Sequence, residues 1–442
     1  MAFLTFKGGV HPPEKKELSE NKEIKALPLP NEVFIYLSNH LGTPAKPIVE
    51  VGQKVKTGQM IAQAEGFISA NIHSSVTGEI TEITEMINAA TGKKDKIIVI
   101  KRTSDDEWQL FEEIKDFKKE TSEVLIQRIK DSGIVGLGGA MFPTHVKLSI
   151  PKGKKADTLI INSAECEPYI TIDDRMMIER TQEIFKGIEI IMHIIGAQHT
   201  YVGVENNTPK AIKSMEEAAK NDQIDVVKLQ TKYPQGAEKQ LIKAITNKEV
   251  PSGKLPIDIG IVVVNVSTAF AVYEAVFKGK PLVERGISLT GEGVKEPGNY
   301  IFRIGTKVKE LLDVCGLFDE DKIDRILYGG PMMGIPLPDI NLSTFKGNNA
   351  LTVMTKDVVK TDKTYPCIRC SACVMVCPTG LQPYLMKKLL DNRKQDDAKE
   401  IGIMDCIECG ACSYICPSHI DLAKTFKTSK KIIRIMSQRK GK

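Results

Sequence analysis

Residues 367–380 read CIRCSACVMVCPTG, and residues 406–419 read CIECGACSYICPSH. Both stretches follow the spacing C-x2-C-x2-C-x3-C-P, in which cysteine thiolates hold a [4Fe–4S] cluster. Together they use eight of the ten cysteines in the chain. The repeated motif therefore predicts a domain folded around two clusters, with one-electron transfer as its chemistry.

In domains with two such motifs, the fourth cysteine of each motif binds the cluster of the other. Zinc would leave the third and fourth cysteines of each motif unexplained. Disulfides would require an oxidising compartment. The two remaining cysteines, Cys166 and Cys315, are expected to be small buried apolar residues. We expect one cluster on Cys367, Cys370, Cys373 and Cys416, and the other on Cys406, Cys409, Cys412 and Cys377.

The bulk composition is that of an ordinary globular protein. The chain has 442 residues, 26% of them charged, and a net charge of +5. This modest charge predicts no nucleic-acid partner. No secretory signal or membrane-spanning segment is expected, and oxygen-sensitive clusters indicate a reducing compartment. Basic residues gather near the C-terminus, namely Lys430, Lys431, Arg434, Arg439 and Lys440.

Short apolar runs separated by glycines begin near residue 31 and predict a β-rich module. The stretch VGQKVKTGQMIAQAEGFISANIHSSVTGEI, residues 51–80, resembles the barrel-sandwich fold of biotinyl and lipoyl domains. Those carriers present a lysine at a hairpin tip, where this chain has Glu65, Gly66 and Phe67. A structural or docking module is therefore expected here rather than a swinging-arm carrier.

From about residue 120 the pattern changes to alternating helices and strands, which predicts an α/β layer with a mainly parallel sheet. One long amphipathic helix is expected over 174–196. Strands dominate again from residue 285, in a stretch that looks like a β-grasp module. The prediction is a multidomain α/β plus β chain with these parts: an N-terminal arm (1–30), a barrel-sandwich hybrid module (31–115), a Rossmann-like α/β domain (120–284), a β-grasp-like module (285–335), a linker (336–360) and a helical two-cluster ferredoxin-like domain with a basic tail (361–442).

Four segments of the α/β part carry candidate binding residues. GIVGLGGAMFPTHVKL, residues 133–148, is a glycine-rich loop whose backbone N–H groups can approach a phosphate or a flat ring. Its spacing is not that of a Rossmann fingerprint, and a tight turn packing on the sheet explains it equally well. The other three segments are INSAECEPYITIDDR (161–175), KYPQGAEKQL (232–241) and VVVNVSTAF (262–270). The acidic residues of the second segment follow a strand, where α/β sheets bind ligands, although such residues also commonly cap helices.

In this order the four segments resemble the flavoprotein subunit of respiratory complex I, which holds FMN and NADH. The barrel-sandwich module, the two-cluster domain and the opening FKGGVHPPEKK are instead similar to the RnfC subunit of the Rnf complex, the ion-translocating ferredoxin:NAD+ oxidoreductase. That resemblance covers nearly the whole chain. By matched position it implies FMN contacts from Gly136, Gly138, Gly139, Lys147, Asn162, Glu165, Tyr233, Gly236, Asn265 and Thr268. It implies nicotinamide-dinucleotide contacts from Phe142, Glu167 and Glu238.

The resemblance also implies a function. Hydride would pass between NAD(H) and FMN, and single electrons would pass between FMN and the clusters, without a catalytic acid or base from the protein. The partners would be the other subunits of a membrane-bound complex and, through a sister subunit, ferredoxin. The location would be peripheral, on the cytoplasmic face of the cell membrane. Two alternatives remain open: a soluble diaphorase subunit of a hydrogenase or formate dehydrogenase, and a flavin-free electron wire or scaffold.

Overall fold

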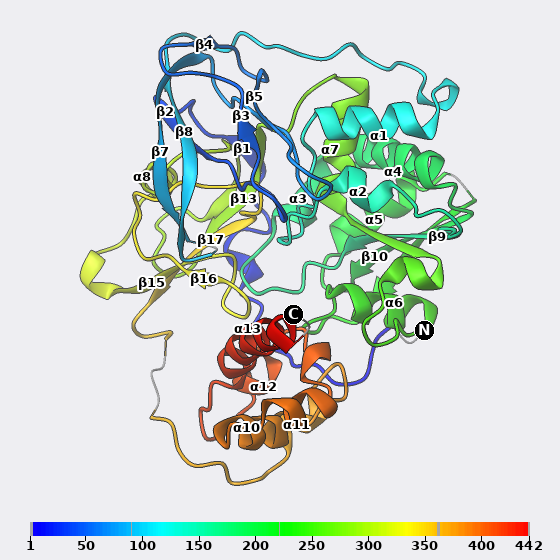
Figure 1. Ribbon diagram of the computed structural model, residues 1–442, viewed down its shortest axis with the longest axis vertical. Coiled ribbons are helices and arrows are strands. Elements are labelled where there is room, and N and C mark those ends of the chain that lie inside the picture. The colour runs from blue at the N-terminus through cyan, green and yellow to red at the C-terminus, as the bar shows by residue number, and fades with distance from the viewer. Residues whose placement is uncertain (1–2, 90, 221, 360–362, 441–442) are drawn as a thin grey trace.

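The computed structural model describes residues 3–89, 91–220, 222–359 and 363–440 (Figure 1). Residues 441–442, at the end of the predicted basic tail, lie outside the described residues. So do residues 360–362, where the predicted linker meets the cluster domain. In the described part of the chain, no helix is both long enough and apolar enough to cross a bilayer.

The barrel-sandwich module consists of two small sheets with the strand orders β2-β8-β7-β4 and β3-β5-β6. Alternate residues of the strands, such as Val33 and Ile35, point into a core of their own between the sheets. At the turn after β5, the side chain of Phe67 is 78% exposed. The strands are β2 Glu32–Tyr36, β3 Lys46–Pro47, β4 Lys54–Val55, β5 Met60–Gln63, β6 Ile72–His73, β7 Gly78–Asn88 and β8 Lys93–Arg102.

The α/β domain has a parallel sheet with the strand order β11-β10-β9-β12. Both faces of the sheet are covered, so Leu159 and Ile161 of β9 enter the large core while Ile160 enters a smaller one. The strands are β9 Thr158–Ser163, β10 His199–Glu205, β11 Ile224–Leu229 and β12 Ile261–Asn265. The helices are α1 Ser122–Asp131, α2 Thr144–Leu148, α3 Ile172–Glu179, α4 Thr181–Ile195, α5 Pro209–Ala218, α6 Glu238–Thr246 and α7 Val266–Phe277.

The single helix predicted over 174–196 is wrong, because the structure has two helices, α3 and α4, separated at Arg180. The two helices pack against different neighbours. Helix α3 contacts α5 and β13 (Glu284–Thr290), whereas α4 packs mainly on α7. The apolar pattern runs across the break, so sequence periodicity alone could not reveal it.

The β-grasp-like module contains a six-stranded sheet with the order β1-β14-β13-β17-β15-β16. Strand β17 lies inside the predicted linker, so that part of the prediction is wrong. Its residues Leu351 and Val353 are fully buried between β13 and β15, which come from distant parts of the chain. The other elements are β1 Ile24–Ala26, β14 Gly298–Arg303, β15 Ile323–Tyr328, β16 Ile335–Pro336, β17 Ala350–Thr355 and helix α8 Val308–Cys315.

The N-terminal arm ties the modules together. The N–H of Leu4 donates to the carbonyl of Lys228 beside β11 (3.1 Å), and the N–H of Gly9 donates to the carbonyl of Val376 in the cluster domain (2.9 Å). Farther along the arm, the Nζ of Lys16 is buried and donates to the carbonyls of Glu165 (2.7 Å) and Ile170 (2.6 Å). Beyond Lys16, β1 pairs in parallel with β14 at the edge of the β-grasp sheet. The predicted surface arm therefore contacts the α/β, cluster and β-grasp modules.

The cluster domain is helical, as predicted, and lies below the α/β domain in Figure 1. One helix was expected between the two cysteine motifs, but Arg393, with φ +57°, separates two helices there. The helices are α9 Ala372–Met375, α10 Pro383–Asp391, α11 Gln395–Glu400, α12 Ala411–Tyr414 and α13 Leu422–Lys440, with a 3-10 turn η5 at Ile403–Asp405.

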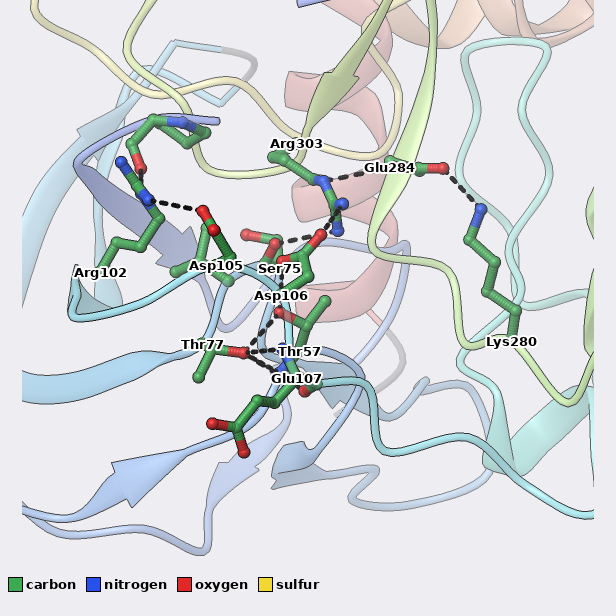
Figure 2. A network of polar contacts seen from close by, with 12 residues as sticks. Thr57, Ser75, Thr77, Arg102, Asp105, Asp106, Glu107, Lys280, Glu284 and Arg303 are labelled. Carbon is green, nitrogen blue, oxygen red and sulfur yellow. Dashed lines mark hydrogen bonds and ion pairs between the residues drawn. The ribbon is translucent and has the colours of Figure 1, made fainter. Parts of the chain in front are cut away.

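A polar network joins the barrel-sandwich module to the β-grasp and α/β modules (Figure 2). Arg303 of β14 pairs with Asp106 and lies 3.3 Å from the Oε2 of Glu284. The hydroxyl of Thr57 donates to the other Asp106 oxygen (2.7 Å). Lys280, which follows α7, completes the chain of charges by pairing with Glu284. The modules therefore meet through buried ion pairs as well as apolar contacts.

Candidate functional site

Two asparagines lie side by side at the carboxyl ends of the central strands, since Asn265 of β12 is in register with Asn162 of β9. The Nδ2 of Asn162 donates to the carbonyl of Gly236 (2.8 Å). Asn265 caps α7 by accepting from the N–H of Thr268 (3.3 Å), and its Nδ2 donates to Asp173 (2.7 Å). The edge where parallel sheets bind ligands therefore carries two positioned amides.

The glycine-rich loop covers this edge. The N–H of Gly136 donates to the carbonyl of Phe142 (2.8 Å), and the N–H of Leu137 donates to the Thr268 hydroxyl (2.8 Å). A Cβ at Gly138 would lie 3.4 Å from the Cβ of Asn265, whereas a Cβ at Gly139 would meet nothing within 4 Å. Both glycines are exposed, so the loop presents bare backbone above the two asparagines.

Gly236 permits the closest approach in the site. A Cβ at this position would lie 2.3 Å from the carbonyl oxygen of Ala164, inside the contact distance of any side chain. Its N–H lies 3.3 Å from the thiol sulfur of Cys166. The loop after β11 therefore lies directly on the loop after β9, and only glycine fits between them.

A lysine and a glutamate that are far apart in the sequence meet at the same edge. The Nζ of Lys147, on α2, lies 2.9 Å from the Oε1 of Glu238 at the start of α6, and it also donates to the carbonyl of Val263 (2.9 Å). The two side chains are 34% and 42% exposed, so both can be reached by a ligand. The partly buried ring of Phe142 stands on the return of the glycine loop.

Three of the predicted contact residues instead hold protein groups. The carboxylate of Glu165 accepts from the N–H of Asp173 (2.9 Å) at the start of α3, and Glu167 accepts from the N–H of Met332 (2.7 Å). Burial raises the pKa of Glu165 to about 8, against the charge of Lys16, and raises that of Glu167 to about 7. The third residue, Tyr233, is buried, and its hydroxyl donates to the carbonyl of Cys409 (2.6 Å).

Two basic residues of the β-grasp module hold the glycine loop from beneath. The Nζ of Lys346 donates to the carbonyl of Gly133 (2.7 Å) and to that of Asn71 in the barrel-sandwich module (3.2 Å). Arg285 donates to the carbonyl of Leu137 (3.1 Å) and to that of Lys346. Both side chains are buried, and burial lowers the pKa of Arg285 to about 10.

Sequence reasoning missed these basic residues, because no local pattern marks Arg285 or Lys346. It also missed Asp173, whose two oxygens accept from the side chains of Asn265 and Ser267. Asp173 lies within a segment already singled out for its acidic residues, so its position was a usable signal.

The open backbone at the glycine loop, the two amides and the exposed amine of Lys147 fit a ligand that has both a phosphate and a flat polar ring, as FMN does. Exposed backbone N–H groups and a cation suit the phosphate. Amide side chains can donate to and accept from the ring edge. The residues present therefore form a plausible donor set for FMN.

The two cysteine motifs have the same backbone shape. Arg369 and Glu408, at matched positions, have φ values of +56° and +59°, and each motif continues into a one-turn helix, α9 or α12. Backbone N–H groups point at sulfur in both motifs, from Leu381 to Cys377 and from Glu408 to Cys406 (3.4 Å each). The chain thus repeats one local fold.

The thiols of the two motifs influence one another in the exchanged pattern that was predicted. Burial raises the pKa of Cys373, and the charges of Cys370 and Cys416 raise it further. Burial also raises the pKa of Cys412, with additional contributions from Cys409, Cys406, Cys377 and Cys373. Among the described residues, no three His, Cys, Asp or Glu side chains meet closely enough for one metal ion. A cube needs a wider arrangement, because each thiolate binds a different iron, and this donor set fits such a cube.

The other two cysteines lie away from these motifs. Cys315 is buried within α8, as predicted. Cys166 is partly exposed, and its sulfur accepts from the N–H of Gly236.

Comparison with family models divides the chain as the structure does. The matches are to the RnfC barrel sandwich hybrid domain over residues 4–105, the Nuo51 FMN-binding domain over 129–274, the SLBB domain over 287–336 and a 4Fe-4S dicluster domain over 366–420. Among solved structures, an NAD+-reducing [NiFe]-hydrogenase in the H2-reduced state has a TM-score of 0.50 at 18% identity. That match covers 72% of this chain and 62% of the hydrogenase chain, and it shows similarity of fold alone.

Curated relatives match over nearly the full length, and all are RnfC subunits. The one from the proton-translocating ferredoxin:NAD(+) oxidoreductase complex of Clostridium ljungdahlii is 42% identical, over 90% of this chain and 86% of its own. Its counterpart in the Na(+)-translocating complex of Acetobacterium woodii is 39% identical, over 99% and 98%. The relative from the ion-translocating oxidoreductase complex of Rhodobacter capsulatus is 39% identical, over 97% and 83%. With this identity and coverage, the chain belongs to the RnfC family of ion-translocating ferredoxin:NAD(+) oxidoreductase complexes.

Proposed function

We propose that this chain transfers electrons between NAD(H) and two [4Fe–4S] clusters through an FMN held at the glycine loop. Its family membership, its FMN-binding and dicluster domain matches and the donor sets described above support this assignment. Bound FMN would supply the step between two-electron hydride chemistry and one-electron cluster chemistry.

One contact carries the proposal furthest. The Tyr233 hydroxyl, in the loop that contains Gly236, donates to the carbonyl of Cys409 in the second cysteine motif (2.6 Å). Val10, Tyr233, Cys409 and Ala411 share one small buried core. The loop beside the proposed flavin site therefore also packs on a cluster ligand, which suits short electron steps between the two groups.

In this proposal each residue has a defined task. Gly136, Gly138 and Gly139 present the loop backbone to FMN, and Lys147 places its charge near the phosphate. The side chains of Asn162, Asn265 and Thr268 and the backbone of Gly236 shape the floor of the site. Phe142 and Glu238 contact the dinucleotide. Glu165, Glu167 and Tyr233 act through the backbone they hold, a role that differs from the direct contacts implied by the resemblance. No side chain is assigned as a general acid or base.

We further propose that the chain works at the cytoplasmic face of a membrane, bound to the other subunits of an Rnf-like complex, and that it exchanges electrons with ferredoxin through a sister subunit. The names of its relatives specify a translocating complex, and two of them specify different ions. No ion is therefore assigned to this chain. Co-purification with membranes distinguishes this function from that of a soluble diaphorase subunit, which would stay in the soluble fraction.

An anaerobic cofactor count tests the assignment directly. Two four-iron cubes and one flavin site predict about eight irons, eight sulfides and one FMN per chain. NADH should bleach the flavin absorbance and then produce EPR signals from reduced clusters. Protein that contains the clusters but binds neither FMN nor NADH would show an electron wire and overturn the proposal.

A further inference from the structure

The two cysteine motifs have the same local fold but different surroundings. In the second motif Cys409 is buried, and Cys406 and Cys412 are partly covered. In the first motif Cys367 and Cys370, at the positions matching Cys406 and Cys409, are both exposed. The fold of the motif does not require this difference, so it arises from what packs against each motif.

The ligands of the second cluster face the rest of the protein. Besides the bond from Tyr233 to Cys409, the Nε2 of Gln240 on α6 donates to the carbonyl of Pro378 (3.3 Å). The N-terminal arm presses on the preceding residue, because a Cβ at Gly8 would lie 2.9 Å from the carbonyl oxygen of Cys377. With the exchanged ligation, Cys377 and Cys409 both bind the second cluster.

The first motif faces outward. In Figure 1 the chain after residue 362 runs along the side of the cluster domain that points away from the α/β domain. Its hydrogen bonds join Tyr365 to Ser418 (3.0 Å) and Thr364 to His419 (3.2 Å), inside the same domain. Around the exposed thiols, the side chains of Tyr365, Ile368 and Met375 are 54%, 68% and 73% exposed.

We propose that the two clusters form an ordered relay. An inner cluster, on Cys406, Cys409, Cys412 and Cys377, exchanges electrons with the flavin site. An outer cluster, on Cys367, Cys370, Cys373 and Cys416, exchanges them with a one-electron redox protein that docks on the apolar face around Cys367 and Cys370. The partner is a redox protein because exposed cluster ligands give access to a redox centre and to nothing else. This inference rests on the proposed function.

The electron balance is simple. NADH releases two electrons and one proton as it becomes NAD+. The electrons pass singly through the inner and then the outer cluster, and two one-electron partners are reduced for each NADH oxidised. When the partner is the donor, the same order runs in reverse, and two reduced partners and one proton convert NAD+ into NADH.

Freeze-quench EPR on the anaerobic holoprotein tests the order. Cys370→Ser, which removes an outer ligand, assigns the outer signal, and Cys409→Ser interrupts the inner cluster. After NADH addition, the outer signal in Cys409→Ser should no longer appear, although dithionite should still produce it. Appearance of the outer signal at the wild-type rate in Cys409→Ser would overturn the relay. If NADH reduces neither cluster in the wild-type protein while dithionite reduces both, the proposed function fails first.

A second measurement on the wild-type protein remains informative if Cys409→Ser does not assemble. A water-soluble gadolinium chelate relaxes exposed paramagnets faster than covered ones. It should broaden the outer signal, assigned with Cys370→Ser, more strongly than the inner one. Equal broadening of both signals, or stronger broadening of the inner signal, would contradict the assignment of an outer cluster.

Discussion

At the scale of single residues, retention of FMN should depend strongly on Lys147, whose amine is the exposed cation at the glycine loop. Lys147→Ala should raise the dissociation constant of FMN about tenfold or more, because hydrogen bonds to a charged group contribute roughly 1.5–3 kcal/mol. Flavin fluorescence titration of the apo-flavin protein measures the change.

Lys154→Ala is the matched control, since Lys154 also forms an ion pair, with Asp258, but beside the amino end of the sheet. It should leave the FMN dissociation constant unchanged. Equal FMN affinity in the two variants would place the phosphate elsewhere.

A second residue-scale prediction concerns Glu205, which burial holds at a pKa of about 8 despite the nearby charge of Lys16. Between about pH 4.5 and 8 the folded chain keeps a proton there that the unfolded chain has released. The free energy of unfolding should therefore fall with rising pH across this window, by up to about 1.4 kcal/mol per pH unit from this group. Glu205→Gln should make the decline shallower.

Anaerobic denaturation at several pH values between 5 and 9 checks this expectation. The exposed Glu217, paired with Lys213 on the surface, offers the control Glu217→Gln, which should keep the wild-type slope. Part of the slope should survive in Glu205→Gln, because Glu165 has a similarly raised pKa. An unchanged slope in Glu205→Gln would mean that Glu205 is ionised in the folded protein.

At the scale of elements, strand β13 supports the glycine loop of another module. Arg285→Met would leave the buried carbonyls of Leu137 and Lys346 without these donors, at a cost of about 1–3 kcal/mol for each unsatisfied group. The variant should lose stability and also bind FMN more weakly, because Leu137 lies within the flavin loop. Thermal unfolding and FMN titration measure the two effects separately.

Arg325→Met is its control, because Arg325 pairs with Asp324 on a more exposed strand. That variant should change neither quantity appreciably. If Arg285→Met lowers stability and leaves FMN affinity intact, Arg285 supports the fold without positioning the loop.

At the scale of the whole molecule, docking of the cluster domain depends on the N-terminal arm. Gly8 has φ +88°, and a Cβ there would meet the carbonyl of Cys377 at 2.9 Å. Gly52 has φ +84° with nothing within 4 Å of its Cβ position, so Gly52→Ala carries the backbone strain alone. Gly8→Ala should therefore slow reduction of the clusters by NADH, whereas Gly52→Ala should not.

Stopped-flow absorbance after NADH addition measures this rate, and dithionite reduction confirms that the clusters are present. Identical NADH kinetics in the two glycine variants would show that the arm is not needed to position the cluster domain.

Across the whole molecule, local patterns predicted the modules well. The cysteine spacing, the β-branched strands and the glycine loop each depend on neighbours within a few residues, and those parts agree with the structure. Strand β17 and the break between α3 and α4 were missed, because their partners come from distant parts of the chain. The carboxylates of Glu165 and Glu167 looked like ligand contacts in the sequence, and the structure shows them holding α3 and Met332 instead.

The sequence by itself determined the kinds of chemistry available: eight thiols at cluster spacing, a glycine loop and amides at strand ends. These features are encoded locally, so they can be read without the fold. Only the tertiary structure decided how they are arranged. It buried Cys409 against Tyr233 and left Cys367 and Cys370 exposed. It also placed Arg285 beneath Leu137, which lies 148 positions earlier in the chain. Long-range packing sets burial and contact between segments, and two nearly identical motifs can therefore occupy different environments.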